Sequence, residues 1–141
     1  MKYIIYILLA CLIFASCLAN NKDTELAIAS CEKYYGYMKA KKVDSVVNLC
    51  SKDFFAETDT AQLLGGLNII QQNHGNVIFS ELVRTETKKS NGKHKIELIF
   101  RVVYSSGYVA QETFRFYSGI GYTGKIDGFR TVKWKDESKT D

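Results

Sequence analysis

The chain has 141 residues, of which 46% are hydrophobic and none is proline, and its formal net charge is +4. No Pro-, Gly- or Ser-rich tract divides it and no repeat is present, so one domain with a short N-terminal appendage is expected. Cations alternate with acids, as in the closing KDESKTD. Because a nucleic-acid surface needs clustered Lys and Arg, nucleic acid is not an expected partner.

The first 16 residues have the order of a signal peptide. Lys2 precedes an apolar run from Tyr3 to Phe14, and small residues follow it. The run is shorter than the roughly 20 residues that a membrane-spanning helix needs. A positive end, an apolar core and small residues before a cleavage site predict export and removal of this segment.

The stretch FASC at 14–17 resembles the lipobox of bacterial lipoproteins. In that family the thiol accepts a diacylglyceryl group and the Cys becomes the first residue after cleavage, so the resemblance implies lipid attachment at Cys17. LLAC, with Cys11, is a rival box that would leave a very short apolar core. Leu18 stands where Asp would signal inner-membrane retention, which implies the outer membrane. The alternative is a plain cleaved signal peptide and a soluble secreted or periplasmic protein.

Three helices are predicted next. Apolar residues three to five apart predict a helix over about 24–41, and a second, shorter helix begins at Asp44. A third covers about 59–73. A kink or split is expected at Gly65 and Gly66, because each Gly costs roughly 1 kcal/mol relative to Ala in a helix.

From Val77 the hydrophobic period changes to two, which predicts four strands joined by short turns. The first strand is expected to be irregular, with a bulge near Ser80 and Glu81. Asn91-Gly92 is typical of a hairpin turn, since both central residues must take positive φ. The predicted strands cover 76–89, 93–104, 108–118 and 125–134, with turns at 90–93 and 105–107 and a loop at 119–124.

Helices followed by a strand meander predict an α+β fold, with N-terminal helices packed on a curved antiparallel sheet of about four strands. The layout resembles the nuclear-transport-factor-2-like superfamily, a cone-shaped, cystatin-like fold that includes SnoaL-type proteins and ketosteroid isomerase. The residues that carry the resemblance are AIASCEKYYGYMKAKKVDSVVNLCSKDFF at 27–55 and GKIDGFRTVKW at 124–134. It is similar, more narrowly, to small secreted domains of unknown function, many of them lipoproteins. The implied domain covers 24–135, between a polar tether at 17–23 and a polar tail at 136–141.

Cys31 and Cys50 are the thiols that remain beyond Cys17 after cleavage. Disulfides persist in the oxidising compartment that export implies. Two antiparallel helices folded near residue 42 would bring these positions roughly opposite each other. A Cys31–Cys50 disulfide is therefore expected, and the alternative is two buried free thiols.

Catalytic members of the superfamily resembled work inside the cone, with a carboxylate or His as base and a Tyr or protonated acid as donor. Glu112 shares the parity of Phe114 and Phe116, which makes it the sharpest candidate to face inward. A carboxylate that faces solvent or pairs with Arg101 is nevertheless the commoner case. No catalytic residue is assigned. The candidate pocket residues are Tyr34, Phe54, Phe100, Glu112, Phe114 and Phe116.

Neither a metal nor a cofactor is expected. His74 and His94 lack Cys, Asp or Glu partners at metal-ligand spacing. GIGYTG at 119–124 has the spacing of a dinucleotide fingerprint, but it precedes a strand instead of opening a helix, which excludes that interpretation.

These patterns favour a membrane-anchored, non-enzymatic lipoprotein that binds a small apolar ligand or an envelope protein. One alternative is a small isomerase-, hydratase- or cyclase-like enzyme, with Glu112 or Asp53 as base and a Tyr as donor. Another is a scaffold that forms a homodimer through the open face of its sheet. An ionisable group with a perturbed pKa in an enclosed cavity would favour the enzyme, and a filled cone with an exposed apolar sheet face would favour interaction.

Overall fold

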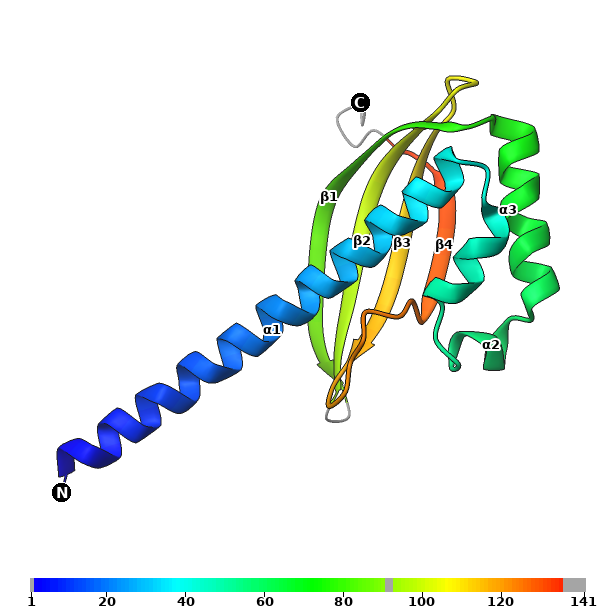
Figure 1. Cartoon of the computed structure of the whole chain (residues 1–141). Coiled ribbons are helices and arrows are strands. Elements are labelled where there is room, and N and C mark those ends of the chain that lie inside the picture. The colour runs from blue at the N-terminus through cyan, green and yellow to red at the C-terminus, as the bar shows by residue number, and fades with distance from the viewer. Residues whose placement is uncertain (1, 91–92, 136–141) are drawn as a thin grey trace.

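The computed structural model describes the backbone of residues 2–90 and 93–135 and the side chains of 21–89 and 93–135. The predicted α+β fold is confirmed: helices come first, and the strands form one antiparallel sheet in the order β1-β2-β3-β4. Figure 1 shows α1 crossing one face of this curved, open sheet, with α3 beyond β4. The elements are α1 (Lys2–Lys39), η1 (Val43–Leu49), α2 (Phe54–Glu57), α3 (Thr60–His74), β1 (Val77–Ser90), β2 (Lys93–Tyr104), β3 (Val109–Ser118) and β4 (Gly128–Lys133).

The first helix is much longer than predicted. It runs unbroken from Lys2 to Lys39, and the expected tether at 17–23 is part of it. The sequence contains no Pro, and no Gly precedes Gly36, so nothing local stops the helix earlier. Its C-terminal half buries one stripe against the sheet, at the three- and four-residue spacings of an amphipathic helix: Ala27, Cys31, Tyr34, Tyr35 and Met38.

The second predicted helix is a 3₁₀ helix. Its buried residues are Val43, Val46 and Leu49, three apart, which share one face when a turn takes three residues. The chain then becomes extended at Cys50, which forms a parallel bridge with Ile126. This bridge fastens the 3₁₀ helix to the segment that leads into β4.

The predicted split in the third helix is wrong, because α3 is continuous from Thr60 to His74. Asp59 caps it: the Asp59 carboxylate accepts from the Gln62 amide N–H at 2.7 Å, and the Gln62 side chain accepts from the Asp59 amide. Both glycines lie on the exposed side, while Leu63 and Leu67 are buried. Capping and packing therefore offset the cost of the glycines. The single-turn α2 was not predicted.

The irregularity predicted in the first strand is present twice. The register of β1 against β2 shifts between Val77 and Phe79 and again between Leu82 and Arg84, on either side of the predicted position. The Asn91-Gly92 turn lies outside the described residues, and so does the predicted tail at 136–141. Alternation along β2 is confirmed, since every predicted inward residue is buried: Ile96, Leu98, Phe100, Val102 and Tyr104.

The last strand is shorter than predicted. β4 begins at Gly128, not at residue 125, because Ile126 pairs with Cys50 and the Asp127 carboxylate accepts from the Tyr117 amide at 2.6 Å. Among the residues that the structure describes, no helix has the length and apolar character needed to span a membrane.

Candidate functional site

Five of the six predicted pocket residues fill the core instead of lining a cavity. The rings of Tyr34 and Phe100 pack edge-on to Phe114, with centroids 5.0 and 5.8 Å away. Edge-to-face packing at these distances is the favourable geometry for aromatic pairs. The residues concerned are Tyr34, Phe100, Glu112, Phe114 and Phe116, all of them buried. The deep part of the cone is therefore filled with side chains.

Among the residues that the structure describes, Glu112 is the one fully buried carboxylate. Its side chain is fully buried and accepts two hydrogen bonds, from the Tyr35 hydroxyl to Oε2 at 3.0 Å and from the Tyr104 hydroxyl to Oε1. The inward orientation suggested by strand parity is confirmed. The pairing with Arg101 does not form, because Glu112 is opposite Phe100 in the sheet and Arg101, the next residue, faces the other side, where its guanidinium lies 6.0 Å from the centroid of the Trp134 ring.

Burial controls the protonation of this cluster. It raises the pKa of Glu112 from 4.5 to about 7, although the hydrogen bonds from Tyr104 and Tyr35 act in the opposite direction. Burial, followed by the nearby Glu112 charge, also raises the pKa of both tyrosines well above the ordinary value. Near neutral pH the carboxyl group can therefore exchange a proton, while the two phenols stay protonated.

Three pockets of the described part of the chain lie outside this cluster, and Glu112 lines none of the three. One pocket, of about 400 Å³, is polar and lies near Lys41, Gln71 and Ser105. The other two are described below. Glu112 is therefore apart from these three pockets, and its side chain is enclosed by the buried residues around it.

A pocket of about 310 Å³ lies between α3 and β4, and we call it the α3–β4 pocket. Phe54 lines it and is the predicted pocket residue that faces a real cavity. The Thr131 hydroxyl, also in the lining, is buried and has no hydrogen-bond partner. The full lining is Phe54, Thr58, Gln62, Leu63, Gly66, Leu67, Ile70, Phe129 and Thr131. Phe54 was the one lining residue named from the sequence, and the apolar spacing of the third predicted helix did not distinguish lining from core positions.

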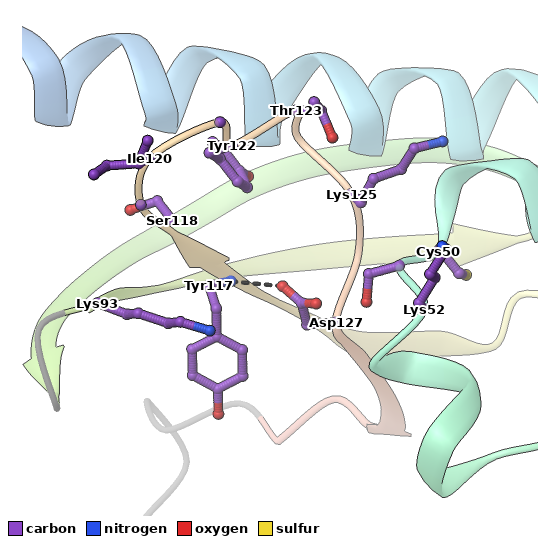
Figure 2. Close-up of a pocket in the computed structure, with 13 residues that line it drawn as sticks. Cys50, Lys52, Lys93, Tyr117, Ser118, Ile120, Tyr122, Thr123, Lys125 and Asp127 are labelled. Carbon is purple, nitrogen blue, oxygen red and sulfur yellow. Dashed lines mark hydrogen bonds between the residues drawn. The ribbon is translucent and has the colours of Figure 1, made fainter.

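The third pocket, of about 750 Å³, lies below α1 and is bounded by the loop between β3 and β4 (Figure 2). No motif in the sequence predicted this pocket. Lys52, Lys93 and Lys125 contribute cations, and Asp127 is the one acid in the lining. These residues are far apart in the sequence, and the β3–β4 loop together with the Cys50–Ile126 bridge brings them together.

The β3–β4 loop is fixed to α1 at Gly124. This residue has φ of 73°, and a Cβ there would lie 2.8 Å from the Leu26 carbonyl oxygen, so only Gly fits. The Ser30 hydroxyl donates to the Gly124 carbonyl, and the Lys125 ammonium group donates to the Asn48 carbonyl. The pocket wall therefore has a defined position against the helix.

The predicted disulfide is corrected to its alternative: Cys31 and Cys50 are both buried free thiols. The prediction assumed two antiparallel helices, but the second element is a 3₁₀ helix and Cys50 lies beyond its end. The Cys50 thiol donates to the Val46 carbonyl at 3.7 Å. Burial raises the pKa of both thiols, that of Cys50 to about 11, so both behave as small apolar side chains.

The Cys17 side chain lies outside the described side chains, so lipid attachment there stays a prediction. Within the described parts of the chain, no three His, Cys, Asp or Glu side chains gather as a metal site would require. Comparison of the sequence with models of known protein families gives no match, and comparison with curated proteins gives none. The resemblance to the nuclear-transport-factor-2-like superfamily therefore also stays a prediction.

Proposed function

We propose that the protein is a lipid-anchored lipoprotein of the bacterial envelope whose domain binds a small, mostly apolar molecule without transforming it. The α3–β4 pocket is the observation that carries this proposal. Its volume of about 310 Å³ is at the lower end of ligand pockets, which run from roughly 300 to 1,000 Å³. The ligand is therefore compact.

The chemistry of the lining indicates what the ligand offers. Most of the wall is aliphatic or aromatic, contributed by α3 and by Phe54 and Phe129. The buried Thr131 hydroxyl lacks a partner, and an unsatisfied buried polar group costs about 1–3 kcal/mol. A ligand with an apolar body and one hydrogen-bonding group would remove this cost.

The lining also favours binding over catalysis. None of the nine residues of the α3–β4 pocket has a side chain that titrates near neutral pH. General acid–base chemistry needs such a group within hydrogen-bond reach of the substrate. The titratable Glu112 is held by Tyr35 and Tyr104 in the filled core.

A pair of adjacent glycines provides a matched test. Gly66 lines the pocket and Gly65 does not, and a Cβ would meet no atom within 4 Å at either position. Leu should raise stability at both sites by about 0.5–1 kcal/mol, because Gly is a poor helix former. Native mass spectrometry of protein purified from its own membranes should show a bound small molecule in wild type and Gly65→Leu, and none in Gly66→Leu.

Equal ligand content in the two variants would contradict the assignment of this pocket. A wild-type protein that carries no small molecule would contradict the binding function itself. Urea unfolding of both variants shows whether each has retained its fold, so loss of ligand is not confused with loss of structure.

Lipid attachment has its own test. Cells grown with a clickable palmitate should label the wild-type protein and the Cys11→Ala variant, but not Cys17→Ala. Cys11→Ala is the matched control because Cys11 belongs to the rival box. Label on Cys17→Ala would refute attachment at Cys17, and loss of label from Cys11→Ala alone would move the attachment to the rival box.

A further inference from the structure

We propose that the end of the domain formed by the β3–β4 loop rests on an anionic lipid surface, with the Ile120 side chain inserted among the head groups. This inference rests on the membrane anchoring proposed above and adds a second contact with the bilayer. We call the contact the loop tip and define it as Ile120 together with Lys52, Lys93 and Lys125. It makes the folded domain, and not its anchor alone, a membrane-binding element.

Ile120 is the most exposed large apolar side chain in the described part of the protein, with a relative exposure of 112%. It stands between Gly119 and Gly121, which have no side chains to cover it. Tyr117, at the end of β3, is 39% exposed and lines the same pocket. A protruding aliphatic residue with an aromatic neighbour suits the boundary between head groups and acyl chains.

A single exposed isoleucine is ordinary on a protein surface, so the surrounding charge decides the argument. Lys52, Lys93 and Lys125 line the pocket beside Ile120. Asp127 is the one acid there, and its carboxylate already accepts from the Tyr117 amide. Three lysines and one aspartate leave a net charge of +2, which attracts the phosphates of an anionic leaflet.

The position of the loop tip fits simultaneous anchoring. Gly124 lies against Leu26 of α1, and Figure 1 shows the N-terminal half of α1 extending past β1 toward the lower left, on the lower side of the molecule where the loop after β3 also lies. Cys17 and Leu26 belong to one unbroken helix, and nine residues of helix span about 14 Å. With α1 oblique to the bilayer, the attachment point and the loop tip reach the same surface.

Tryptophan quenching tests this contact in the full chain. In a Trp134→Phe background, one variant has Ile120→Trp and its control has Ile69→Trp, at a position on α3 that is 57% exposed. Both are reconstituted into phosphatidylcholine vesicles with and without phosphatidylglycerol, using lipids brominated near the head group. We expect strong quenching and a blue shift for the tryptophan at 120 only when phosphatidylglycerol is present, and little quenching at 69.

Lysine-to-glutamine variants test whether the lysines of the loop tip attract the anionic lipid. Lys52→Gln combined with Lys93→Gln should reduce the quenching at position 120 severalfold, and raised salt should have the same effect on the lysine-containing protein. Lys125 is kept, because its ammonium group holds the Asn48 carbonyl. If neither the two lysine substitutions nor raised salt changes the quenching at position 120, the electrostatic part of the proposal is wrong.

Vesicle flotation and quenching together distinguish a failure of the loop-tip contact from a failure of the lipid anchor. Protein that floats with the vesicles but shows no quenching at position 120 would refute the loop tip and leave the anchor intact. Protein that fails to float would refute both. If soluble glycerol phosphate shifts the emission at position 120 while vesicles do not, the pocket takes a soluble anion and the membrane contact is wrong.

Discussion

Replacing Glu112 with Gln should make the protein more stable than wild type at pH 8 and remove most of the pH dependence of its unfolding. The wild-type pKa of about 7 in the folded state is above the ordinary 4.5. Between these values the folded protein retains a proton that the unfolded chain releases, so the free energy of unfolding falls as pH rises. The difference corresponds to roughly 3 kcal/mol, present below about pH 4.5 and lost above about pH 7.

The groups around the Glu112 carboxyl are consistent with a free energy of unfolding that falls as pH rises. Tyr34, Tyr35 and Cys31 from α1 and Tyr104 from β2 all have pKa values raised by burial, so all four stay protonated and uncharged near neutral pH, and none of them balances a negative charge on Glu112. The ionised form of Glu112 is therefore held by hydrogen bonds alone. An amide of the same shape keeps hydrogen bonding to the phenols without burying a charge.

Urea unfolding at several pH values, followed by circular dichroism, measures this effect. Glu97→Gln is the control, because Glu97 is a partly exposed carboxylate that pairs with Lys95 at 2.7 Å on the sheet. That variant should change stability by under about 1 kcal/mol and keep the wild-type pH trend. A Glu112→Gln protein with the wild-type slope would show that Glu112 does not titrate in this range.

Truncating Phe114 to Ala should cost about 3–5 kcal/mol, the largest loss expected from a single core substitution here. The side chain is fully buried. Its ring centroid lies between 5.0 and 5.9 Å from those of Tyr34, Tyr35, Phe100 and Phe129. Its removal leaves a cavity where α1 meets the sheet, and the surrounding rings can close it only in part.

Chemical denaturation compares this variant with Tyr117→Ala, which truncates a ring on the same strand that is 39% exposed. The control should lose under about 1 kcal/mol. Phe114→Leu is a milder substitution at the same site, which gives a measurable midpoint if the Ala variant does not fold. Equal losses for Phe114→Ala and Tyr117→Ala would mean that the packed aromatic cluster does not dominate the stability of the domain.

Strand parity was the most informative signal in the sequence. Alternation in β2 and β3 correctly predicted which side of the sheet is buried, and it put Glu112 on that side with Phe114 and Phe116. One expectation was wrong, namely that a carboxylate on a strand usually faces solvent. Glu112 is buried because it accepts a hydrogen bond from Tyr35 of α1, which lies 77 positions earlier in the sequence. No local sequence pattern reveals such a partner.

Other predictions failed because tertiary packing outweighed the local conformational preference of the residues. Gly65 and Gly66 predicted a break, but an Asp59 cap and two buried leucines hold α3 together. Five predicted pocket residues became core because α1 side chains fill the space above the sheet, a fit that depends on helix placement. The α3–β4 pocket was missed for the same reason, since lining and core positions share one apolar pattern.

The two register shifts in β1 affect how readily one copy of the protein can pair with another through the edge of its sheet. β1 is an outer strand, 14 residues long, with β2 as its one neighbour in the sheet. An exposed straight edge of this length would offer its free N–H and C=O groups to a strand from another copy, the first step towards fibrils. The bulges at Ile78 and Val83 interrupt that row and increase its twist, and Lys88 and Lys89 add repulsion near its end. Neighbouring copies are therefore kept from pairing edge to edge through β1.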